Sequence, residues 1–122
     1  MLMRLLVVSL LILMPLCTHA AVKVFACEPE WAALAREIGR ERVTVTSATT
    51  AQQDPHSIQA RPSLIAGLRK ADLLICTGAG LEAGWLPLLQ RRASNPAVLT
   101  GKPGYIEAAS VVNMLDRPVS LD

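Results

Sequence analysis

The side chains best suited to hold a metal ion gather in one polar segment, TTAQQDPHSIQARP, at residues 49–62. It contains His56, one of the two histidines of the chain, directly behind Asp54 and Pro55. A neutral imidazole is the commonest protein ligand of zinc and related metals, and a neighbouring carboxylate often orients the ring. We therefore take His56 as a candidate metal ligand. The alternative is an ordinary solvated loop histidine.

One imidazole does not complete a zinc site, because about three protein ligands are needed even in sites with an open position. The other donors expected nearby are carboxylates, each of which is equally explained as a solvated loop or helix-start residue: Asp54, Glu28, Glu30 and Glu82. We expect that this chain alone does not bind zinc tightly.

Two further patterns suggest other chemistry. GAGLEA at residues 78–83 fits the dinucleotide pattern G-x-G-x-x-A, but it follows the third expected strand and has no acidic strand end about 20 residues on. A tight turn explains it equally well.

Cys27 or Cys76 beside His56 could form a thiol dyad. A serine hydrolase would need a nucleophile elbow, G-x-S-x-G, which no serine here provides. We predict no catalytic residues and no enzyme.

The first twenty residues have the pattern of a secretory signal peptide. Arg4 precedes an apolar run of about a dozen residues, shorter than the roughly 20 that span a membrane, and THA then offers cleavage after Ala20. An uncleaved anchor is the alternative. Lipidation at Cys17 is disfavoured, because Leu16 stands where processing needs a small side chain. We expect an exported, periplasmic chain of residues 21–122.

Charge and composition exclude several partners. Loss of Arg4 takes the basic residues from 12 to 11, against 10 acidic ones, so no electrostatic footprint for nucleic acid remains. Four aromatic residues remain after cleavage, which gives little stacking surface for bases or sugars: Phe25, Trp31, Trp85 and Tyr105.

The elements that position His56 alternate between strands and helices. Strand patterns at residues 22–27, 41–49 and 72–76 predict three strands, and helical spacing predicts helices at 28–39 and 61–71. This order predicts an α/β fold with a small parallel sheet flanked by helices, βαβαβ. Further on, we expect a turn at 77–84, a short helix at 85–92, a minor strand and turn at 97–104 and a last helix at 105–115.

The segments that follow the three strands should meet at one edge, because ligands of open parallel sheets bind beyond the carboxyl ends of the strands. The first strand of such a unit usually lies between the other two, so Cys27 and Cys76 would end adjacent strands. Strand spacing near 4.8 Å is compatible with a disulfide, and an exported chain sits in an oxidising compartment. A Cys27–Cys76 disulfide is our hypothesis, and two buried free thiols are the alternative.

Five landmarks in order give the chain a family resemblance. They are Asp54-Pro55-His56, Pro62-Ser63, Ala71-Asp72-Leu73, the turn from Gly78 to Glu82, and Trp85-Leu86. This pattern resembles the N-terminal lobe of the zinc/manganese substrate-binding proteins of bacterial ABC importers.

The resemblance implies that His56 is the first metal ligand of a two-lobed clamshell that delivers Zn²⁺, or alternatively Mn²⁺, to a membrane permease. It implies that residues 21–122 are the N-terminal lobe, and that the remaining ligands lie beyond residue 122 in a second lobe that this chain lacks. Contact with the membrane would come only through the permease or an uncleaved signal. The alternatives are an exported receptor for an organic or chelated-metal ligand and, less favoured, an exported hydrolase or thiol enzyme.

Overall fold

The computed structural model describes residues 20–115. The predicted signal peptide, including Cys17, lies outside this range apart from Ala20. Within residues 20–115, no helix is long and apolar enough to cross a membrane.

A parallel sheet forms the centre of the fold. Its strand order is β2 (Val43–Ser47), β1 (Val22–Ala26), β3 (Leu73–Cys76) and β4 (Tyr105–Glu107). All three neighbouring pairs are parallel. The prediction of a small parallel α/β sheet, with the first strand between the second and third, is therefore confirmed.

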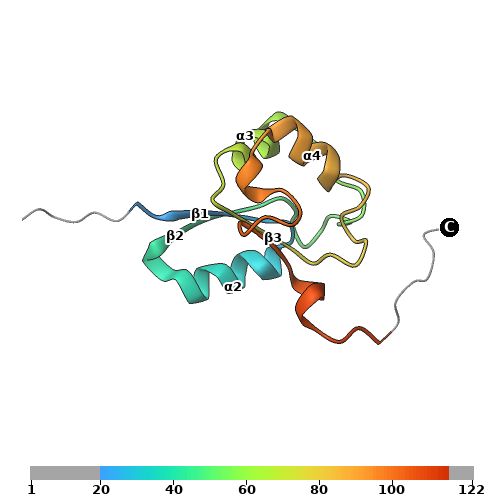
Figure 1. The fold of residues 1–122 in the computed structure, drawn as a ribbon, viewed down its shortest axis with the longest axis horizontal. Helices are drawn as coiled ribbons and strands as arrows, with labels where there is room; N and C mark the ends of the chain where they lie inside the picture. Colours follow the sequence, from blue (N-terminus) through green and yellow to red (C-terminus); the bar gives the residue numbers. More distant parts are fainter. Residues whose placement is uncertain (1–19, 116–122) are drawn as a thin grey trace, which may run out of the picture.

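Helices cover both faces of this sheet (Figure 1). Helix α2 (Pro29–Gly39) lies on one face, and α3 (Pro62–Arg69) and α4 (Leu86–Ala93) lie together on the other. Each begins with a proline in its first turn, where no intrahelical donor is needed. The short 3₁₀ segments are η1 (Arg40–Arg42), η2 (Pro96–Val98) and η3 (Ala108–Val111).

The hydrophobic core lies between the sheet and the pair α3 and α4. Phe25, Leu68, Leu74 and Leu89 are completely buried there. Gly67 lets α3 approach the sheet closely, since a Cβ at this position would lie 3.2 Å from the Phe25 ring. This packing fixes the position of the strands, and therefore also the starting points of the loops that leave their carboxyl ends.

Two predictions for the C-terminal part are wrong. The minor strand expected at 97–104 is absent, and the chain there forms η2 and turns. The helix expected at 105–115 is replaced by strand β4 and then η3. The edge of β3 explains the difference, because its backbone groups pair with Tyr105 and its neighbours in register. Sheet pairing thus overrides the helical spacing of this segment.

Candidate metal-binding site

The segments after β1, β2 and β3 meet at one rim of the sheet, as expected. The backbone N–H of Cys27 donates to the Ile75 carbonyl at 2.8 Å, and that of Thr49 donates to the Cys27 carbonyl at 3.2 Å. The Thr49 hydroxyl donates to the same carbonyl at 2.9 Å. The loop that carries His56 therefore starts from a point fixed to the central strand.

His56 lies on the outside of this rim, with its side chain 67% exposed. Its Nδ1 lies 2.8 Å from Asp54 Oδ1, and its backbone N–H donates to the same oxygen at 3.0 Å. The backbone bond and then the ring bond hold the pKa of the Asp54 carboxyl below its usual value. An ionised carboxylate only accepts, so in the neutral imidazole Nδ1 carries the proton and Nε2 keeps its lone pair. This tautomer leaves Nε2 free to bind a metal ion.

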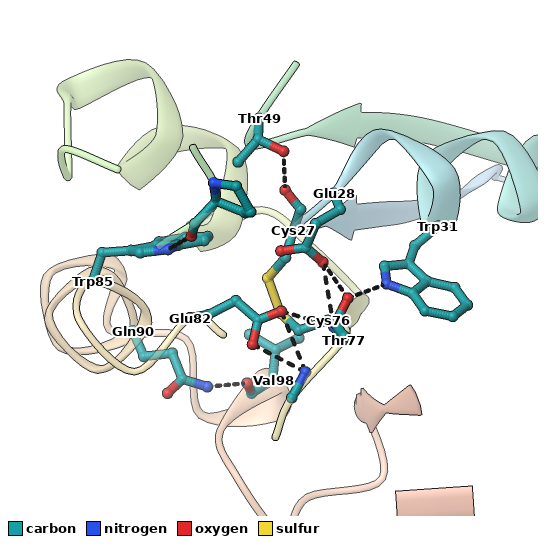
Figure 2. The surroundings of a disulfide bond; sticks show 12 residues. Cys27, Glu28, Trp31, Thr49, Cys76, Thr77, Glu82, Trp85, Gln90 and Val98 are labelled. Atoms are coloured by element: carbon teal, nitrogen blue, oxygen red, sulfur yellow. Dashed lines mark hydrogen bonds between the residues drawn. A yellow bond between two sulfur atoms is a disulfide. The ribbon is translucent and has the colours of Figure 1, made fainter. Parts of the chain in front are cut away.

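The backbone next to His56 is anchored to the core by Trp85, whose side chain is labelled in Figure 2. The indole N–H of this buried residue donates to the Pro55 carbonyl at 2.7 Å. Gly84 lets the backbone of the His56 loop approach closely, since a Cβ at position 84 would lie 3.1 Å from the His56 carbonyl oxygen. The imidazole of His56 is therefore exposed, whereas the backbone on either side of it is held in place by contacts with Trp85 and Gly84. Nothing in the sequence pattern indicated this role of Trp85, although a buried indole N–H usually has a hydrogen-bond partner.

Cys27 and Cys76 form the hypothesised disulfide between β1 and β3. Their Cα atoms are 4.8 Å apart, and both residues are completely buried. The two thiols are therefore joined to each other. Neither cysteine therefore has a free thiol that could form a dyad with His56 in this structure.

Two of the four candidate carboxylates, Glu28 and Glu82, are buried rather than solvated, at 2% and 3% exposed. Both accept from the backbone N–H of Thr77, at 3.3 Å and 2.8 Å respectively (Figure 2). The Thr77 hydroxyl also donates to Glu28 at 3.0 Å and accepts from the Trp31 indole at 2.7 Å. Burial first, and then the neighbouring Glu82, raise the pKa of Glu28 to about 8. Glu30 is exposed.

The glycine-rich turn is organised by these carboxylates. Gly78, Ala79 and Gly80 all have positive φ angles. Glu82 accepts from the N–H of Gly78 at 3.0 Å, and Glu107 accepts from that of Ala79 at 3.3 Å. Two N–H groups of this turn, those of Gly78 and Ala79, are therefore already bonded to carboxylates, which does not favour the dinucleotide interpretation of this segment.

An open pocket of about 220 Å³ lies between the start of α2 and the His56 loop. Glu28, Thr49, Gln53, Pro55 and Leu81 are among the residues that line it. The described lining contains no aromatic side chain. This pocket therefore offers no aromatic surface on which an organic ligand could stack.

Solved structures share this fold. One is the Mn-bound periplasmic metal binding protein from Candidatus Liberibacter asiaticus, at 24% identity and a TM-score of 0.59, covering 74% of this chain and 31% of that one. A crystal structure of ZnuA has 27% identity and a TM-score of 0.55, with coverages of 62% and 28%. A zinc-bound ZnuA with residues 138–173 deleted has 25% identity and a TM-score of 0.63, with coverages of 76% and 33%.

This chain spans about a third of the length of those structures. No curated protein sequence matches it. A family model does, that of the zinc-uptake complex component A, periplasmic, which covers residues 24–113 and thus most of the described fold. This is a family of periplasmic metal-binding transport receptors, not of enzymes. The chain belongs to the family of the periplasmic zinc-uptake complex component A.

Proposed function

We propose that this chain forms the metal-capturing N-terminal lobe of a periplasmic receptor that passes Zn²⁺ to the membrane permease of an ABC importer. The observation that carries the proposal is the presentation of His56. Its ring is exposed at the carboxyl rim of the sheet, and its Nδ1 is engaged by Asp54. The Nε2 lone pair is thereby directed to an incoming ion. Family membership and the metal-bound relatives support the same function.

Zn²⁺ is proposed over Mn²⁺ from ligand chemistry. Imidazole nitrogen suits zinc, whereas manganese prefers carboxylate, carbonyl and water oxygens. The described rim offers one imidazole to solvent, and two of its carboxylates are turned inward to Thr77. Relatives with manganese and with zinc bound are both known, so the choice depends on the whole ligand set.

The remaining ligands would come from a second lobe, which closes on this rim. In this proposal residues 1–20 are the signal peptide and residues 21–122 are the first lobe. A lone lobe offers a single imidazole, so its own affinity for zinc should be low. Tight capture then requires closure of the two lobes around the ion.

Zinc titration of the oxidised chain, followed by long-range ¹H–¹⁵N spectra of the imidazole, tests the ligand assignment. We expect Zn²⁺ to shift the Nε2 resonance of His56 with weak affinity, and His56→Ala to abolish zinc binding. Ser57→Ala, next to it in the same loop, is the matched control and should bind like the wild type. An unshifted Nε2 at millimolar zinc would refute the assignment. A submicromolar affinity lost in His56→Ala would refute the need for a second lobe.

A further inference from the structure

A second group of metal-ligating atoms lies inside the rim, apart from His56. The Sγ atoms of Cys27 and Cys76 and a carboxylate oxygen of Glu82 all lie within 4.8 Å of one another. All three residues are buried. Figure 2 shows Glu82 extending from its turn toward the disulfide, with Glu28 beside them. Two sulfurs and a carboxylate are the donor types of a zinc or cadmium site.

Glu28 supplies a second, independent observation. Its Oε1 is buried and has no hydrogen-bond partner among the described residues. Its other oxygen, Oε2, accepts from the same Thr77 N–H as Glu82, so the two carboxyl groups lie next to each other. A buried carboxylate oxygen without a donor requires a proton or a cation. It is therefore available as a fourth ligand.

We propose that the dithiol form of this chain binds a thiophilic divalent ion, Zn²⁺ or Cd²⁺, between the thiolates of Cys27 and Cys76 and the carboxylate of Glu82, with Glu28 completing the site. With Zn–S bonds of about 2.3 Å and Zn–O bonds of about 2.0–2.2 Å, tetrahedral ligand atoms lie roughly 3.5 Å apart. The two sulfurs, bonded to each other in the disulfide, would separate to this spacing after reduction, and a Glu82 oxygen already lies within 4.8 Å of both. The Cα atoms of the two cysteines are 4.8 Å apart, so both side chains can reach the same ion.

The step between the two forms is a thiol–disulfide exchange. An external dithiol breaks the S–S bond, and two electrons and two protons pass to Cys27 and Cys76 while the dithiol becomes a disulfide. The metal ion then displaces one proton from each thiol and, at neutral pH, the proton of the Glu28 carboxyl, and these protons pass to water. Metal and disulfide thus compete for the same two sulfurs. If the transported ion is zinc, as proposed above, the disulfide also prevents that ion from binding at this buried site.

Cadmium titration of the reduced chain tests this site, because thiolate-to-cadmium charge transfer absorbs in the near ultraviolet. The chain is reduced with a phosphine, freed of reductant without oxygen, and titrated with Cd²⁺. We expect this absorption to saturate at one ion per chain. It should be absent in the oxidised chain and greatly reduced in Cys76→Ser. Glu82→Gln should weaken binding at least about tenfold, whereas the exposed Glu30→Gln should bind like the wild type.

His56→Ala separates this proposal from the proposed function. It should leave the thiolate absorption of the reduced chain unchanged, and loss of the absorption in this variant would overturn the internal site. No absorption in the reduced wild type, or equal affinity in Glu82→Gln and Glu30→Gln, would also overturn it.

Circular dichroism covers the case in which the reduced chain unfolds without metal. One equivalent of Cd²⁺ should then restore the helical signal of the wild type, because metal binding supplies folding free energy. Glu82→Gln should need about tenfold more metal for the same recovery. No recovery in the wild type would refute the proposal.

Discussion

Glu28 and Glu82 accept hydrogen bonds from a single backbone donor, the N–H of Thr77. Two buried carboxyl groups thus meet at one N–H, and the second oxygen of Glu28, Oε1, is buried without a partner among the described residues. A proton on this oxygen would let Glu28 donate to Glu82. Desolvation, reinforced by Glu82, accordingly raises the pKa of Glu28 from 4.5 to about 8. In the folded protein Glu28 is therefore protonated at neutral pH.

This proton makes the stability of the oxidised chain depend on pH. Between about pH 4.5 and pH 8 the unfolded chain has lost the Glu28 proton and the folded chain retains it, so the free energy of unfolding falls as the pH rises. Over this window we expect a loss on the order of 4 kcal/mol. Urea unfolding at several pH values measures it. Glu28→Gln, which resembles the protonated form, should flatten the profile, and the exposed Glu30→Gln should not. A wild-type profile as flat as that of Glu28→Gln would contradict the assignment.

The Cys27–Cys76 disulfide should be a major source of stability. It closes a loop with a sequence separation of 49, and the loop-closure entropy then corresponds to about 4 kcal/mol. The double variant Cys27→Ala/Cys76→Ala should lose roughly 2–4 kcal/mol in urea unfolding. A reductant should lower the stability of the wild type and leave that of the double variant unchanged. Equal stability of the wild type and the double variant in oxidising buffer would refute this role.

The parts of the fold that could be predicted from the sequence are those set by local pattern. Apolar runs and helical spacing locate β1, β2 and β3 and the helices between them. The usual strand order of such a unit was enough to bring Cys27 next to Cys76. The segment after Lys102 could not be predicted in this way, because Tyr105 pairs with an open strand edge that only the folded sheet provides.

In the candidate site, too, local contacts could be predicted from the sequence and contacts between distant residues could not. The contact between His56 and Asp54 is local, at a separation of two residues, and the sequence predicts it. The bond from Trp85 to Pro55 joins residues 30 apart, and no periodicity in the sequence indicates it. Burial of Glu28 and Glu82 was also missed, since a carboxylate after a strand is usually solvated. Their contacts depend on the neighbouring turn at Thr77.

The indole of Trp85 should hold the His56 loop in place. Trp85→Phe keeps an aromatic ring but removes the N–H that binds the Pro55 carbonyl at 2.7 Å. A net contribution of about 1 kcal/mol for one hydrogen bond predicts roughly fivefold faster amide exchange at His56 and Ser57. Trp31→Phe removes an indole bond of the same length, to Thr77, and is the matched control. Equal exchange of the loop amides in both variants would show that Trp85 does not anchor the loop.

Asp54 should set the tautomer and the metal affinity of His56. In Asp54→Asn the side-chain amide is neutral, and its NH₂ group can donate to Nδ1 of His56. The ring proton would then move to Nε2 and block the atom that we propose as the metal ligand. We expect imidazole ¹⁵N spectra to show more of the Nε2–H tautomer, and zinc affinity at His56 to fall about tenfold, as for other lost partners of ligating histidines. Asp54→Ala should weaken zinc binding similarly without donating to Nδ1, whereas Ser57→Ala should change neither property. Wild-type zinc affinity in both Asp54 variants would show that the 2.8 Å contact between Asp54 and the ring does not prepare His56 for metal.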